Sequence, residues 1–145
     1  GIVDVQKAIL GTAEIKKAQA ELESRFKPRQ EQMAKLDREL QQIQGQLQSM
    51  AGKLTQQAEA DLQAQGRIKQ RDLQRLNEDL QADVDRERND ILAKAGRQMT
   101  DVIKKLAEQK GLDVVIDRAN TLYNKDALDL TNDAIAAYDA AYPAK

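Results

Sequence analysis

The sequence contains no cysteine and no histidine. Without cysteine there is no disulfide, thiol nucleophile or thiolate zinc site, and without histidine the usual proton shuttle at neutral pH is missing. The serines, Ser24 and Ser49, lie in a region of helical pattern and have no histidine to activate them. No glycine-rich phosphate loop occurs. These absences argue against an enzyme and against a bound cofactor.

A metal site is not expected either. Asp126, Asp129 and Asp133 lack the alternating ligands and the central glycine of an EF-hand loop, so we interpret them as turn and capping residues. Aromatic residues are also scarce, at 3% of the chain, whereas charged residues make up 32%. A compact globule of this length normally buries several aromatic rings. The composition therefore favours long, exposed helices.

The net charge of −1 produces no overall field that would attract nucleic acid or an anionic membrane. The basic cluster from Arg67 to Arg71 covers one helical turn and has no interleaved aromatic residue, so we expect no nucleic-acid partner. No apolar run approaches the ~20 residues needed to cross a bilayer. No pattern of a signal peptide is visible.

The middle of the chain, from about residue 13 to residue 110, has a helical pattern almost throughout. From Met33 to Leu54, apolar residues recur in alternating steps of three and four, the heptad pattern of a coiled coil. The best candidate for a turn is Ser49–Thr55, which overlaps the end of this run: Gly52 can end one helix and Thr55 can cap the next. We therefore predict two antiparallel helices with a turn near residues 50–55. Pro28 lies inside the first helix and should kink it or mark a join.

Folding the chain at Gly52 brings together residues whose numbers sum to roughly 105, which pairs apolar residues along much of the hairpin. The pairs are Phe26 with Leu80, Leu22 with Val84, Ile15 with Ile91, Met33 with Leu73, and Ile43 with Leu62. Leu36 and Leu40 instead face the polar or small residues Gln65, Gly66 and Lys69.

We predict a loose arm tip that presents leucine and methionine to unfolded chains. The candidate client-binding residues are Met33, Leu36, Leu40, Ile43, Leu47, Met50, Leu54, Leu62 and Ile68. The default interpretation is that these side chains serve only as the seam of the coiled coil, and client contact by part of them is the hypothesis set beside it. The glutamines around them form a solvated helical face.

Residues 1–21 and 98–145 are predicted to form a small α+β body, and residues 22–97 the arm. Three short strands are predicted: Ile2–Val5, Leu112–Asp117 and a run near Thr121–Tyr123. Gly111 should end the second arm helix, while Thr12 and Thr131 should cap the helices that follow them.

So small a sheet leaves apolar edges uncovered, which predicts oligomerisation. The candidate subunit-interface residues are Ile2, Val3, Val5, Val114, Val115, Ile116, Leu122 and Tyr123. The predicted fold class is mainly α: a long antiparallel coiled-coil hairpin projects from a small α+β body, and the body oligomerises through its short strands.

Several blocks of sequence, in this order and together with the hairpin, resemble the Skp/OmpH family of periplasmic chaperones. The matching blocks are Ile2–Gln6, Gly111–Asp117, Asn120–Tyr123 and Asp129–Asp133. The resemblance implies a homotrimer in the periplasm, with three helical arms around a cavity that holds unfolded outer-membrane proteins, and without ATP or catalytic residues.

Familiar members of this family are strongly basic, whereas residues 22–97 of this chain hold 14 lysines and arginines against 13 acidic residues. We therefore do not expect charge to drive the capture of clients, lipopolysaccharide or phospholipid. Two other functions are open: a coiled-coil scaffold or adaptor that joins specific folded partners, and a prefoldin-like cytosolic chaperone. A secretory signal upstream of Gly1 would favour the periplasmic chaperone over the prefoldin-like cytosolic one.

Overall fold

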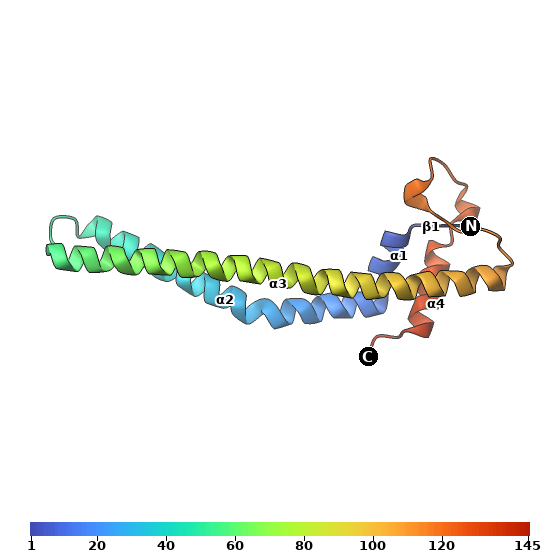
Figure 1. Ribbon diagram of the computed structural model, residues 1–145, viewed down its shortest axis with the longest axis horizontal. Coiled ribbons are helices and arrows are strands. Elements are labelled where there is room, and N and C mark those ends of the chain that lie inside the picture. The colour runs from blue at the N-terminus through green and yellow to red at the C-terminus, as the bar shows by residue number, and fades with distance from the viewer. The chain divides into compact units, whose positions relative to one another are not determined.

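The computed structural model describes all residues from Gly1 to Lys145 (Figure 1). Its elements in chain order are β1 (Ile2–Val3), α1 (Val5–Gly11), α2 (Ala13–Ser49), α3 (Gln56–Lys110), β2 (Ile116–Asp117), two single 3₁₀ turns (Arg118–Asn120 and Asp126–Leu128) and α4 (Thr131–Ala141). The predicted fold class, mainly helical with a long antiparallel hairpin and a small strand pair, is confirmed. No helix is both long and apolar enough to span a membrane.

The chain divides into two compact units. The arm unit is Glu23–Asp85, and the body unit combines Gly1–Leu22 with Arg86–Lys145. The body unit thus includes the part of α3 between residues 86 and 97, which the sequence-based ranges assign to the arm.

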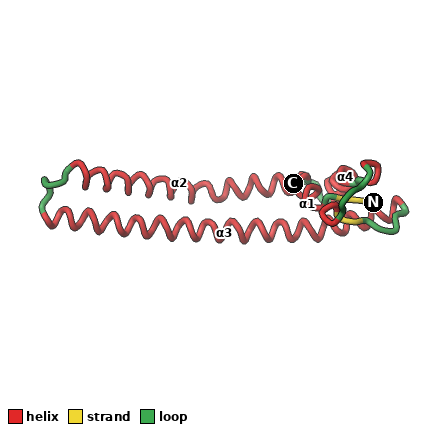
Figure 2. Tube along the Cα trace, turned by 90° about the horizontal axis from the view of Figure 1, so that it is seen from above, coloured by secondary structure: helices red, strands yellow, loops and turns green.

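In the arm unit, α2 and α3 run antiparallel and are joined by a short turn (Figure 2). Thr55 caps α3 as predicted, because its Oγ1 accepts a hydrogen bond of 3.1 Å from the N–H of Ala58. Gly52 does not cap α2, which already ends at Ser49. Its φ of 81° instead closes the turn, at a conformation that glycine adopts without strain from a Cβ atom.

Helix α2 is continuous through Pro28, so of the two predicted alternatives, a kink or a join, the join is excluded. Proline has no N–H, so the carbonyl of Ser24 loses the donor that a helix normally places four residues later. Ser24 and Pro28 are both exposed. Solvent can therefore reach the freed carbonyl, which reduces the cost of a proline inside the helix.

The core of the body unit gathers residues from both ends of the chain. Its fully packed members are Val3, Ala8, Met99, Val102, Leu106, Ala134 and Tyr138. Strand β1 lies at the centre of the small sheet: it pairs in parallel with β2, with Ile2 opposite Ile116, and Ile2 also bridges Asp129. The N–H of Ile116 donates to the carbonyl of Gly1 at 3.0 Å, and the N–H of Leu130 donates to that of Ile2 at 2.7 Å.

The predicted strands form only in part. Of the run Leu112–Asp117, only Ile116–Asp117 is strand, and residues 121–123 form no strand. The reason lies in β1, which is too short to pair with more residues. Asp4 ends it by capping α1, because its side chain accepts a hydrogen bond of 3.1 Å from the N–H of Lys7.

Two of the predicted helix ends in the body unit are confirmed. Gly111 has a φ of 67° and ends α3. The N–H of Leu112 donates to the carbonyl of Ala107 at 2.9 Å, and that of Gly111 to Glu108 at 3.2 Å, which together make a Schellman motif. Thr12 caps α2, because its Oγ1 accepts from the N–H of Ile15 at 3.3 Å.

The predicted cap at Thr131 is wrong, because Thr131 is the buried first residue of α4. The N-cap position of α4 is Leu130, and the Oδ1 of the preceding Asp129 accepts a hydrogen bond of 2.9 Å from the N–H of Thr131. Hydrogen bonds from the Thr131 hydroxyl and backbone hold the pKa of Asp129 below its usual value. The Oγ1 of Thr131 in turn accepts from the N–H of Asp4 at 3.0 Å, so the start of α4 is tied to the end of β1.

Helix α4 also holds the base of the two long helices within the body unit. The carboxylate of Asp139 accepts from the N–H of Ala13 at 3.0 Å, at the first turn of α2. The hydroxyl of Tyr138 donates to Oε1 of Gln98 on α3 at 2.7 Å. The Tyr138 ring is buried and lies 5.1 Å from that of Tyr142, centroid to centroid.

Tyr138 makes the body unit sensitive to alkaline pH. Burial, reinforced by the nearby Glu14 carboxylate, raises the pKa of Tyr138 to about 12, against 10.0 for a free phenol. The folded state therefore favours the neutral phenol. The contribution of Tyr138 to the free energy of unfolding is fully present below pH 10 and is lost as the pH rises toward about 12. We expect the urea midpoint to fall over this window. The Tyr138→Phe variant should show a smaller fall, and an equal fall in both proteins would contradict the assignment.

Candidate functional site

The nine predicted client-binding residues are not equally accessible in the structure. Met50 and Ile68 are exposed, at 40% and 50% of their surface. Ile43 is buried in the seam and offers almost no surface. The remaining six are half-buried: Met33, Leu36, Leu40, Leu47, Leu54 and Leu62. The two most exposed residues of this set therefore lie at the turn (Met50) and on α3 (Ile68).

Gly66 brings the two helices close together at the level where the sequence predicts loose packing. A Cβ atom on Gly66 would lie 3.4 Å from Cγ2 of Ile43 and 4.0 Å from Cδ1 of Leu40. The glycine thus leaves room for larger residues of α2, which explains why Ile43 is buried. The predicted looseness is absent at this level.

An ion pair crosses the same part of the seam. Nζ of Lys69 lies 2.7 Å from Oε2 of Glu39. This hydrogen bond lowers the pKa of the Glu39 carboxyl. The pair is about one-third exposed, so we expect it to fix the register of the helices more than to stabilise them. From the sequence, Lys69 was noted only as a polar residue opposite Leu36 and Leu40. Its ion pair with Glu39 was not predicted, because the pattern of apolar residues does not reveal ion pairs across a seam.

Two grooves open on the seam closer to the arm base. One has a volume of about 540 Å³ and exposes Met33 and Leu73 beside Asp37 and Gln70. The other, of about 290 Å³, exposes Leu36 and Leu76. Leu73 and Leu76 are absent from the predicted client-binding residues, because their heptad positions identify them as seam and give no measure of how much of them remains exposed.

Arg29 and Asp83 form a second ion pair between the helices, with 2.7 Å between Nη1 and Oδ2. The guanidinium of Arg29 also lies 5.5 Å from the centre of the Phe26 ring, in a cation–π contact. Phe26 and Leu80 are both buried, as their predicted pairing requires. This part of the arm unit is more tightly packed than the turn.

The predicted subunit-interface residues separate into two groups. Ile2 and Val3 are buried within the chain itself, and Val5 and Val115 are half-buried. Val114, Ile116, Leu122 and Tyr123 are exposed, and Leu122 and Tyr123 are the most exposed large apolar residues, at 108% and 80%. Leu128 is also exposed, and sequence reasoning missed it because it lies in a polar segment without strand periodicity. We call these five residues the apolar body patch.

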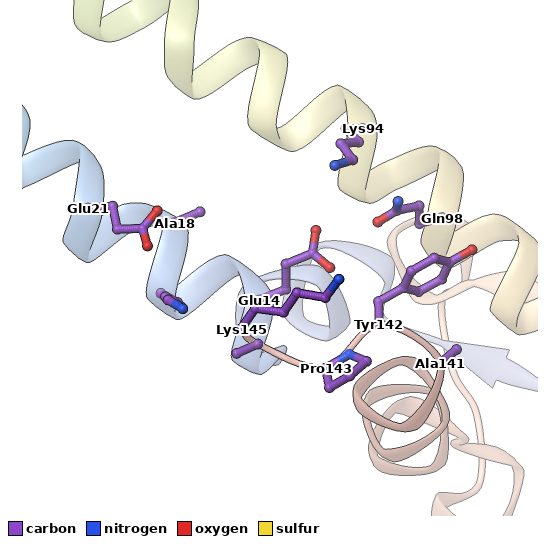
Figure 3. A pocket seen from close by; sticks show the side chains of 11 residues that line it. Glu14, Ala18, Glu21, Lys94, Gln98, Ala141, Tyr142, Pro143 and Lys145 are labelled. Carbon is purple, nitrogen blue, oxygen red and sulfur yellow. The ribbon is translucent and has the colours of Figure 1, made fainter.

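A cleft of about 510 Å³ lies in the body unit between α2, α3 and the segment that follows α4 (Figure 3). Its charged residues are Lys17, Lys94 and Lys145, with Glu14 and Glu21. Charges of both signs therefore face it, and no group of acidic residues in the chain is arranged to hold a metal ion. The cleft has no arrangement of groups suited to a single ligand.

Gly45 offers a direct way to stiffen the arm near the turn. A Cβ atom there would meet nothing within 4 Å. Gly45→Ala should therefore stabilise α2 by about 1 kcal/mol through helix propensity alone, and slow amide exchange in residues 41–50. Gly52→Ala is the matched control and should destabilise the protein, because the φ of 81° suits only glycine. Faster exchange in Gly45→Ala would contradict the prediction.

The fold and these surfaces define a coiled-coil hairpin protein with exposed apolar residues on both its arm and its body. The sequence model of the OmpH-like outer membrane protein family matches residues 1–138, nearly the whole chain, and the chain belongs to this family.

Several solved chains share the fold. One is an OmpH-like protein from Caulobacter crescentus CB15, described provisionally as an outer membrane chaperone. It has a TM-score of 0.81 at 19% sequence identity, over 99% of this chain and 85% of the Caulobacter chain. No curated protein matches the sequence.

Proposed function

We propose that this protein is an ATP-independent holdase chaperone that binds unfolded outer-membrane proteins between its helical arms in the periplasm. The observation that carries the proposal is the OmpH-like family match over residues 1–138, which supports a chaperone role. The arm unit adds a physical basis, because Met50 and Ile68 expose apolar surface that an unfolded chain can cover.

Binding at the arm needs no bound nucleotide or covalent step. Each apolar contact with a client removes surface from water and contributes roughly 25 cal/mol per Å². Methionine suits clients of varied sequence, because its unbranched side chain adapts to differently shaped partners. Many weak contacts of this kind hold an unfolded chain away from other unfolded chains while leaving it free to dissociate.

The apolar body patch supports a trimer as the working form. Leu122 and Tyr123 are too exposed to contribute to the fold of a single chain, and a second copy could cover them. In a ring of three, each copy uses one surface against the next copy and a different surface against the previous one. Three arm units would then surround one client, and confinement would add to the contacts of each arm.

The charge of the arm favours apolar contact over electrostatic capture. Residues 22–97 carry nearly equal numbers of basic and acidic side chains. Anionic lipid or lipopolysaccharide would gain little from such a surface, because attraction by its basic residues is offset by repulsion from its acidic residues. The remaining field is screened beyond a Debye length of about 8 Å. We therefore propose that binding depends weakly on salt and that lipid is not a partner.

Dilution of a urea-unfolded β-barrel membrane protein into buffer tests the proposal. We expect the purified protein at low-micromolar concentration to suppress light scattering by the client without nucleotide. Multi-angle light scattering should then give the mass of a trimer with one client. A stable monomer without suppression, together with tight binding to one folded partner, would favour the scaffold instead.

A further inference from the structure

The distal part of the arm is almost free of charge. Among residues 40–66, only Lys53, Glu59 and Asp61 are charged, whereas the arm unit as a whole is rich in lysine, arginine and acidic residues. The same segment has nine glutamines, all exposed: Gln41, Gln42, Gln44, Gln46, Gln48, Gln56, Gln57, Gln63 and Gln65. We call residues 40–66 the neutral tip.

Helix formation does not explain this composition. Lysine, glutamate and arginine have helix propensities close to that of glutamine, so any of them would serve on a solvated face. Charged residues at such positions would also favour solubility. Within the arm unit, charge is scarce only in the segment that includes the exposed Met50. That low charge and exposed apolar surface occur together points to a role in binding.

The side chains of the neutral tip offer two kinds of contact. Met50 is exposed and Leu47 and Leu54 are half-buried, so apolar groups are accessible around the turn. The glutamine amides supply a donor and an acceptor each, as a peptide bond does. Within the chain, Gln41 donates to Asp37 at 3.3 Å and Gln57 to Asp61 at 3.0 Å, and the other amides have no partner in the protein.

We propose that the neutral tip binds uncharged, extended segments of unfolded polypeptide, with apolar side chains against Met50, Leu47 and Leu54 and peptide groups against the glutamine amides. This inference rests on the proposed chaperone function and names the segment of client that the arm selects. A charged residue in the bound segment would lose water and find few counter-charges, because only Lys53, Glu59 and Asp61 are charged in the neutral tip, so charge of either sign weakens binding.

Peptide binding tests the selectivity directly. Three fluorescein-labelled peptides of about 12 residues would be used: an alternating valine–threonine sequence, and two versions with two threonines replaced by glutamate or by lysine. Fluorescence anisotropy should show both charged peptides binding at least about fivefold more weakly than the neutral one. The Kd of the neutral peptide should change by less than about twofold between about 50 and 500 mM NaCl.

Variants locate the site. Gln44→Lys combined with Gln56→Lys places a charge on each helix of the neutral tip, and should weaken the neutral peptide about fivefold while strengthening the glutamate peptide. Gln19→Lys with Gln30→Lys is the matched control at exposed positions of α2 outside the tip, and should change neither. Circular dichroism would verify equal helix content in both variants.

The outcomes separate this inference from the proposed function. Charged peptides that bind as tightly as the neutral one, or a tip variant that behaves like its control, would overturn the inference. If aggregation of the β-barrel client is still suppressed in that case, the chaperone function stands. Wild-type protein that binds the neutral peptide at the tip but suppresses no aggregation would instead overturn the proposed function.

Discussion

Serine at both Leu122 and Tyr123 is expected to convert the proposed trimer into monomers. These are the two most exposed large apolar residues, so their burial between copies would be the largest apolar contribution of the apolar body patch to assembly. Removing a buried leucine and a buried tyrosine side chain costs roughly 2 kcal/mol or more each, at every interface of the ring. Light-scattering mass across a micromolar dilution series measures the result.

The monomer should also lose most of its suppression of client aggregation, because one arm cannot enclose a client. Leu10→Ser is the matched control, since Leu10 is an exposed apolar residue of α1 outside the apolar body patch. The thermal midpoint of the body at low concentration should stay within a few degrees in both variants. A trimer that survives the double substitution would show that other residues hold the copies together.

Tyr138→Ala should destabilise the body unit by about 3–5 kcal/mol, a large fraction of the roughly 5–15 kcal/mol that stabilises a typical domain. The tyrosine is buried against the core of the body, and its removal leaves a cavity together with an unpaired Gln98. The urea dependence of the far-ultraviolet circular dichroism gives the free energy of unfolding. The arm unit should keep part of the helical signal after the body has unfolded.

Tyr138→Phe controls for the hydroxyl. It keeps the ring and removes only the hydrogen bond to Gln98, so we expect a loss of about 1 kcal/mol. Tyr142→Ala controls for position, because Tyr142 is half-buried at the edge of the same core and should cost less than Tyr138→Ala. Similar losses for the two alanine variants would mean that Tyr138 does not hold the core together.

The hairpin could be predicted from sequence because its determinants are local. Steps of three and four from Met33 to Leu47 fix a helix and its apolar face, and Thr55 fixes the start of the next helix. The sheet could not be predicted to the same extent. The β-prone runs show which residues can pair, but the length of pairing depends on where Asp4 caps α1, which is a competition between strand and helix.

The candidate surfaces were predictable in kind but not in accessibility. Gly66 looked like a weak point in a helix, yet a Cβ atom there would lie only 3.4 Å from Cγ2 of Ile43 on the facing helix. Ile43 is buried for that reason, although its heptad position resembles that of the half-buried Leu40. Leu128 was not predicted to belong to an apolar surface, because no periodic pattern of apolar residues surrounds it. Exposure of a given side chain depends on the residue across the interface, which a single helix pattern does not contain.

The pairing of β1 with β2 sets the order in which the chain can fold. The N–H of Ile116 bonds to the carbonyl of Gly1, so the sheet joins segments that lie far apart in the sequence and carries a large loop-closure entropy. The hairpin turn at residues 50–55 closes first, because its contacts are local and form quickly. Once its two helices have paired, the arm brings its own ends together and shortens the loop that the pairing of β1 with β2 must close. A slow or damaged arm would therefore delay the body, and the rate-limiting step of folding should respond to substitutions at Leu80 more than to those at Ile116.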